Sequence, residues 1–103
     1  MILTKKIEND ELAFYVSYNP MCLSCNMRYE EISNLEKLLK NIKFYAFDVF
    51  EGDSVLQDLK ISKTPFFMIS RNGIVIDIFY VYPNLERLYL KLYKLLRSEK
   101  NDW

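Results

Sequence analysis

Residues 12–25 read LAFYVSYNPMCLSC, an apolar run that ends at Asn19-Pro20 and is followed by two cysteines, Cys22 and Cys25. Residues 12–18 are almost continuously apolar or aromatic, which is typical of a strand buried on both faces of a sheet. Asn-Pro is a turn signal, so the strand is expected to end there. The two cysteines therefore stand at the point where a buried strand gives way to the next element.

A long amphipathic helix is predicted downstream of the cysteines. Apolar residues recur there at spacings of three and four, namely Tyr29, Ile32, Leu35, Leu39 and Ile42. Charged residues stand between them, which predicts about four turns of helix with one apolar face. Cys22 would then lie at or just before the helix N-terminus, where unpaired amide N–H groups and the helix dipole stabilise an anion. Cysteines in such positions ionise readily and become nucleophiles.

The spacing of the two cysteines places a second thiol, that of Cys25, close to the thiol of Cys22. Residues three apart on a helix lie one turn apart on the same face, close enough for a disulfide bridge. This arrangement predicts thiol–disulfide exchange, in which Cys22 attacks a disulfide and Cys25 resolves the mixed disulfide that forms. Both residues are therefore candidate catalytic residues.

The rest of the chain predicts further alternation of strands and helices. The expected elements are a strand over 43–50, a short helix over 53–60, a strand over 66–70, a hairpin turn at Asn72-Gly73, a strand over 74–81, and a helix over 85–96 capped by Asn84. A strand–helix–strand opening implies a parallel pair with a right-handed crossover, and the hairpin adds two antiparallel strands. The predicted fold class is α/β, with one mixed four-stranded sheet flanked by helices in a single domain over residues 1–103.

Composition narrows the function classes. The chain has 103 residues, of which 50% are hydrophobic, so a single soluble domain with one real core is expected. Fourteen Lys and Arg balance fourteen Asp and Glu, and no nucleic acid or membrane partner is predicted. The absence of histidine removes Ser–His and Cys–His nucleophile pairs, and no cofactor is predicted. No secretory signal or membrane-spanning stretch is visible, so a cytoplasmic location is expected.

At this point the chain resembles the thioredoxin family. Four segments match family landmarks in the right order, namely residues 18–25 around the cysteines, 47–51 at a strand end, 61–65 before a strand, and 71–73 at a hairpin. The resemblance implies a thioredoxin-like fold whose N-terminal strand and helix are abbreviated or lost. It further implies protein disulfides as substrates, a reductase like thioredoxin reductase as electron donor, and a role in electron transport.

The resemblance also assigns substrate-binding residues. Pro65 matches the family's cis proline, and Thr64 before it is implied to pair through its backbone with the substrate chain. Met21 replaces the tryptophan before the first cysteine. Val81, beside Tyr80, replaces a glycine of the substrate groove. Met21, Tyr80 and Val81 are thus implied to contact the substrate.

One departure concerns the proton chemistry of the second cysteine. The family buries an aspartate beneath that cysteine, and the aligned residue here is Val16. Deprotonation of Cys25 would then depend on water or on a more distant carboxylate, Glu30 or Glu31.

Other interpretations of the cysteine pair stay open. The pair could be half of a zinc site completed by another chain, because zinc takes four ligands and this chain offers two cysteines and no histidine. It could be a structural bridge, although so short a loop gains little from cross-linking. It could deliver a metal ion through the two thiolates. Finally, the chain could be a non-catalytic adaptor that binds a partner protein through the surface around the motif, formed by Met21, Tyr80, Val81 and Tyr82.

Overall fold

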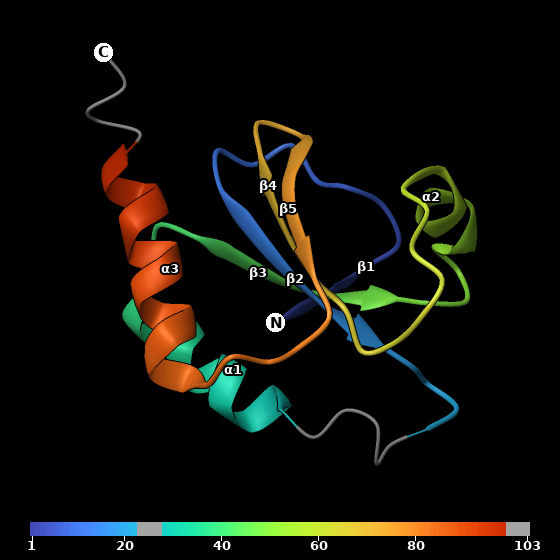
Figure 1. Cartoon of the computed structure of the whole chain (residues 1–103), viewed down its shortest axis with the longest axis horizontal. Coiled ribbons are helices and arrows are strands. Elements are labelled where there is room, and N and C mark those ends of the chain that lie inside the picture. The colour runs from blue at the N-terminus through green and yellow to red at the C-terminus, as the bar shows by residue number, and fades with distance from the viewer. Residues whose placement is uncertain (23–27, 99–103) are drawn as a thin grey trace.

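The computed structural model describes residues 1–22 and 28–98 (Figure 1). Its elements run in the order β1 (Ile2–Thr4), β2 (Ala13–Tyr18), α1 (Tyr29–Leu38), β3 (Lys43–Asp48), α2 (Asp53–Asp58), β4 (Phe67–Arg71), β5 (Ile74–Phe79) and α3 (Leu85–Ser98). No helix in this described part is long and apolar enough to span a bilayer. Strands alternate with helices through most of the chain, which confirms the α/β class.

The strands form one mixed sheet of five in the order β1-β3-β2-β4-β5. β2 lies at its centre, parallel to β3 and antiparallel to β4, where Val16 faces Phe67 in register. The mixed sheet is as predicted, but the expected count of four strands is corrected to five because β1 pairs in parallel with β3. β1 has three residues and is the abbreviated N-terminal strand that was expected. Its Ile2 and Leu3 remain exposed, so the strand is held by backbone pairing and no buried apolar pattern marks it in the sequence.

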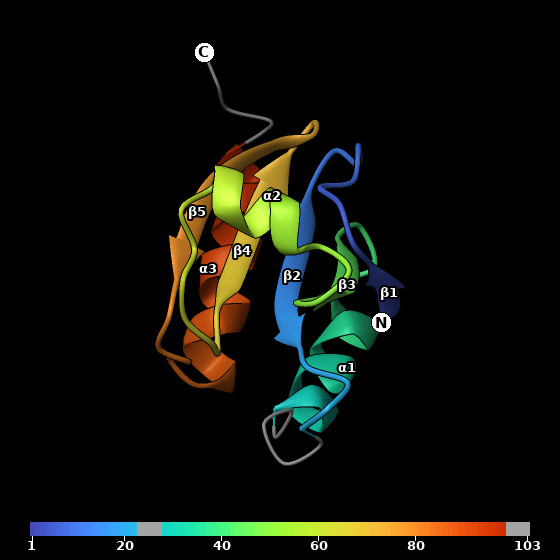
Figure 2. The same cartoon turned by 90° about the vertical axis from the view of Figure 1, so that its right-hand side faces the viewer.

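Helices cover both faces of the sheet. α1 and α3 lie on one face and α2 on the other (Figure 2). Successive strand residues point to opposite faces, so Phe14 and Phe67 join the cluster under α1 and α3, whereas Tyr15 and Phe47 join the cluster under α2. Because a slip of one residue would exchange these faces, the two clusters fix the register of β2.

Four predicted elements are shorter in the structure, namely α1, β3, α2 and β5. α1 ends at Leu38 and not near Ile42, because Leu39 takes φ −110° and ψ 70° and leaves the helical geometry. A turn follows, in which Ile42 N donates to Leu39 O, and both side chains are still buried. β5 ends at Phe79, so residues 80–82 form a loop and not the end of a strand.

The β4–β5 hairpin is confirmed and is tied to α3. Asn72 and Gly73 adopt φ of 53° and 81°, the positive values that a tight two-residue turn requires. Arg71, which precedes them, donates from Nη2 to the carbonyl oxygen of Leu95 at 2.7 Å. The hairpin therefore holds the last turns of α3 beside the edge of the sheet.

The N-terminus of α3 is capped as predicted, since Asn84 Oδ1 accepts a hydrogen bond from Arg87 N at 2.8 Å. Asn84→Ala removes this acceptor and is expected to lower the free energy of unfolding by about 1 kcal/mol. Asn84→Asp keeps an acceptor at the same place and serves as the matched control. Urea denaturation measures both, and an alanine variant as stable as the parent would contradict the capping role.

Candidate active site

A tight turn presents Cys22 directly after the central strand β2. Cys22 N donates to Asn19 O at 3.2 Å, and Met21 N donates to Asn19 Oδ1 at 2.9 Å. Asn at the first position and Pro20 at the second are the residues that such a turn favours. Cys22 is half-buried in this turn and is not a free thiol in the structure.

The second cysteine lies outside the described residues. Residues 23–27 fall there, and with them Cys25, the predicted pairing of the two cysteines, and the link from Cys22 to α1. The described part of α1 begins at Tyr29. The pairing and the placement of Cys22 at a helix N-terminus therefore stay predictions.

The segment before β4 lies against the end of β2. The Thr64–Pro65 peptide bond is cis, the geometry that the resemblance implies for this proline. Phe66, the residue after this proline, forms two hydrogen bonds with Ser17: Ser17 N donates to Phe66 O at 3.0 Å, and Phe66 N donates to Ser17 Oγ at 3.1 Å. The proline is thus fixed beside the strand that leads to Cys22.

A cavity of about 350 Å³ joins these segments. Among the described residues it is lined by Val16, Ser17, Asn19, Arg28, Tyr29, Val49, Thr64, Pro65, Phe67 and Tyr82. The end of β2, the segment before β4 and the loop after β5 come together near the middle of Figure 1. Strand ends from three places in the sequence thus surround one hollow next to the turn of Cys22.

Two tyrosines place their hydroxyl groups in this cavity region. The hydroxyls of Tyr29 and Tyr82 are buried; that of Tyr29 has no hydrogen-bond partner in the described part of the chain, and that of Tyr82 lies near Glu31. Burial raises the pKa of both phenols, and the nearby Tyr18 and Asp48 raise the pKa of Tyr29 further. Both phenols therefore keep their protons to a higher pH than an exposed tyrosine does. The Arg28 guanidinium lies 4.9 Å from the centre of the Tyr82 ring.

The comparisons with known proteins agree with this geometry. No family model matches the chain. The thioredoxin-like protein YusE of Bacillus subtilis is 23% identical over 83 residues, which are 81% of this chain and 77% of that protein. The Plasmodium falciparum thioredoxin structure aligns with TM-score 0.74 and 20% identity over 91% of this chain and 98% of its own. Thioredoxin from Trypanosoma brucei brucei aligns with TM-score 0.74 and 16% identity over 93% and 90% of the two chains.

The chain is thioredoxin-like. The described residues contain the sheet order, the helices on both faces and the cis proline beside the strand that leads to Cys22. The thioredoxin-like fold was predicted from four short landmarks, and this prediction is confirmed.

In this thioredoxin-like protein, the predicted substrate-binding residues divide into two groups. Thr64 and Pro65 are exposed and line the cavity. Met21 and Val81 do not line it and instead stand out into solvent, with 81% and 78% of their surfaces exposed. Tyr80 is half-buried under Lys63, whose Nζ lies 4.7 Å from the ring centre. The structure thus brings Thr64 and Pro65 together at the cavity, whereas Met21, Tyr80 and Val81 do not line it.

The carboxylates suggested as proton acceptors do not belong to the cavity. Glu30 is exposed, and Glu31 forms an ion pair with Arg28 at 3.3 Å. Val16 is buried and also lines the cavity. No group of three or more metal-ligating side chains occurs among the residues that the structure describes.

Sequence reasoning missed Ser17 and Tyr29 as parts of the site. Ser17 is the one hydroxyl-bearing small residue in the apolar run of β2, and this interruption was a signal that its side chain has a specific partner. Tyr29 gave no such signal, because its spacing from Ile32 also fits the apolar face of a helix. Only the fold shows that its hydroxyl is buried at the cavity.

The raised phenol pKa values predict a loss of stability at alkaline pH. Unfolded tyrosine ionises near its ordinary pKa of 10.0, whereas folded Tyr29 and Tyr82 hold their protons to higher pH. Above pH 10 the unfolded chain thus binds fewer protons, and the free energy of unfolding falls as pH rises. Below that pH this contribution is fully present. Urea midpoints at about pH 8 and about pH 11 measure the fall.

A pair of substitutions checks the cause of this alkaline effect. Tyr29→Phe removes one buried phenol and is expected to make the fall shallower. Tyr93→Phe changes a tyrosine on the exposed side of α3 and is the matched control. If the two variants showed the same pH dependence, burial of Tyr29 would not be the cause.

Proposed function

We propose that this protein exchanges disulfides with protein substrates through the dithiol of Cys22 and Cys25. The observation that carries the proposal is the meeting of two segments at one cavity: the turn that ends at Cys22, and the cis Thr64–Pro65 segment. A cysteine next to an exposed backbone segment can meet a disulfide in an extended chain. The thioredoxins to which the fold is similar support the same chemistry.

The proposed reaction has two displacement steps. The Cys22 thiolate attacks one sulfur of the substrate disulfide, so that a mixed disulfide forms and the other substrate sulfur leaves as a thiolate. The Cys25 thiolate then attacks the Cys22 sulfur and releases the second substrate thiolate. The protein's two thiols are oxidised to a disulfide, the substrate disulfide is reduced to two thiols, and the protons of the protein's thiols pass to the products through solvent.

The surrounding residues orient the substrate in this proposal. Thr64, exposed before the cis proline, offers its backbone to the substrate chain, and Pro65 keeps that segment against the cavity. Met21 and Val81 offer flexible and branched apolar surface to the residues that flank the substrate disulfide. Reduction of the oxidised protein would come from a partner that resembles thioredoxin reductase, in a reducing cytoplasmic setting.

The proposal is tested by insulin reduction. The full chain with dithiothreitol as electron source is expected to precipitate the insulin B chain faster than dithiothreitol alone. A Cys22→Ser/Cys25→Ser double variant is the control for effects of the folded protein that do not need thiols. Equal rates for the parent and the double variant would overturn the proposal.

A second function, that of a non-catalytic adaptor, is favoured by the exposure of Met21 and Val81. Both leave about four-fifths of their surface in solvent, and a contiguous apolar patch of such side chains would mark a contact with another protein. The adaptor and the oxidoreductase differ in their need for the cysteines. If the double cysteine variant stays folded and keeps the biological activity of the parent, the adaptor is the better description.

A further inference from the structure

A second hollow lies between α3 and the edge strand β5, and its lining residues differ from those of the first cavity. This groove measures about 640 Å³ and is lined by Ile76, Asp77, Pro83, Arg87, Leu90, Lys91, Lys94, Leu95 and Ser98. β5 is the last strand of the sheet, so its outer side pairs with no other strand of the described chain. The groove contains none of the residues assigned above to the reaction.

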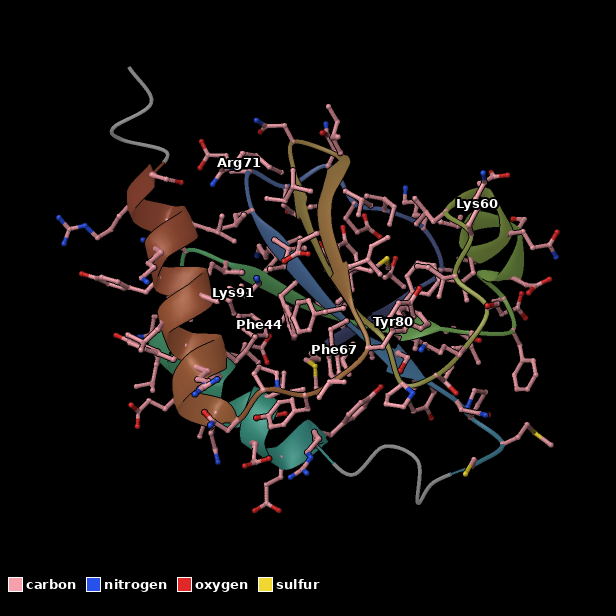
Figure 3. All side chains as sticks on the ribbon, viewed as in Figure 1. Phe44, Lys60, Phe67, Arg71, Tyr80 and Lys91 are labelled. Carbon is pink, nitrogen blue, oxygen red and sulfur yellow. The ribbon has the colours of Figure 1, made fainter. Side chains whose placement is uncertain are left out.

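The charges in this groove are unbalanced. Three cations line it, Arg87, Lys91 and Lys94, against one carboxylate, Asp77. Lys91 is paired with that carboxylate, with Nζ 2.8 Å from Asp77 Oδ2, and in Figure 3 it extends from α3 towards the sheet. Within residues 1–22 and 28–98, Arg87 and Lys94 form no ion pair. Two positive charges are thus left for a partner, although the whole chain is neutral.

The groove also exposes apolar surface. Ile76 and Leu90 leave 44% and 45% of their surfaces in solvent, and Ile74 on the same strand leaves 68%. Register shifts at Ile69 and Ser70, opposite Asp77 and Val75, show that Ile76 lies at a bulge of the edge strand. Bulges at sheet edges re-aim side chains, and this one coincides with an isoleucine in the groove wall.

We propose that this groove binds an acidic segment of a partner protein that also carries apolar side chains. Carboxylates of the segment would pair with Arg87 and Lys94, and its apolar side chains would cover Ile76 and Leu90. An extended or helical chain fits a concave groove, whereas a flat anionic membrane would meet the outer side of α3 and leave the groove walls unfilled. The inference does not depend on the cysteine chemistry, because no cysteine takes part.

The first test uses a probe of stated chemistry. A short fluorescein-labelled peptide of Glu, Leu and Gly, rich in Glu, is titrated with the full chain and followed by fluorescence anisotropy. The expected result is saturable binding that weakens as salt rises, because charge pairs at a surface are screened. A matched peptide with Gln in place of Glu is expected to bind at least about tenfold more weakly.

Variants locate the binding. Arg87→Glu/Lys94→Glu reverses the two unpaired charges and is expected to weaken binding of the Glu-rich peptide at least about tenfold. Lys37→Glu/Lys40→Glu makes the same charge change at exposed positions on and after α1, and is expected to bind like the parent. Leu90→Ser tests the apolar wall and is expected to weaken binding without a change in charge.

Several outcomes would overturn the inference. Equal losses in the two charge-reversed variants would mean attraction by general charge and not by the groove. No binding of the Glu-rich peptide, or preferential binding of the chain to phosphatidylserine vesicles, would also overturn it. So would a dimer of the chain in sedimentation that Leu90→Ser dissociates, because a second copy would then occupy the groove.

Discussion

Replacement of Cys22 by serine is expected to lower the rate of disulfide reduction at least about a thousandfold. A serine hydroxyl does not ionise near neutral pH, so no anion is left to attack the substrate disulfide at the turn after β2. The substitution changes one atom in a half-buried side chain, and the fold should therefore be kept. The rate is measured by reduction of an aromatic disulfide, followed by absorbance of the released thiolate.

Cys25→Ser is the matched variant for this experiment. It keeps the attacking thiol and removes the resolving thiol, so one substrate half is expected to stay attached to Cys22 as a mixed disulfide. Mass spectrometry of the intact chain shows the added mass, and digestion places it on Cys22. A mixed disulfide that formed instead in Cys22→Ser would reverse the proposed roles, and its absence from both variants would contradict exchange chemistry.

The largest effect on stability is expected from Phe67→Ala. Phe67 is 1% exposed, and its ring centre lies 5.3 Å from that of Phe79, 5.8 Å from that of Tyr82 and 6.2 Å from that of Phe14. The substitution removes three ring contacts and leaves a void next to the existing cavity. A loss of about 3–5 kcal/mol in the free energy of unfolding is expected, a large part of the stability of a small domain.

A second substitution at Phe67 separates two causes of the lost stability, the void and the lost ring contacts. Phe67→Leu keeps most of the apolar volume and is expected to cost clearly less than Phe67→Ala. Both are measured by urea denaturation with circular dichroism. If alanine and leucine destabilised the protein equally, loss of the specific ring contacts would explain the effect better than a void.

The parts of the fold that follow from apolar pattern and turn chemistry were predictable from the sequence. β2 was predictable because its run is apolar on both faces, and the hairpin because Asn72-Gly73 suits positive φ. β1 was not, because Ile2 and Leu3 stay exposed and the strand depends on pairing with a distant segment. Local pattern carries no information on such pairing.

The candidate site was predictable where a residue type is tied to backbone geometry. Pro65 before a strand was such a case, and its cis bond agrees with the implied geometry. Tyr29 was not, because an amphipathic helix accepts tyrosine for its ring alone. Tyr82 belonged to a suggested binding surface, but the burial of its hydroxyl depends on tertiary packing and was not predictable. The sequence also predicted that Val81 would end a strand, whereas the structure places it in an exposed loop.

The lining of the cavity has a consequence for electrochemistry. Its described ionisable side chains are one arginine and two tyrosines, and residues 23–27 contain no carboxylate in the sequence. A buried carboxylate that changed its protonation with the redox state would bend a plot of midpoint potential against pH at its own pKa. For the proposed dithiol, no bend from a carboxylate of the cavity is therefore expected, and the plot should bend only where the thiols themselves ionise.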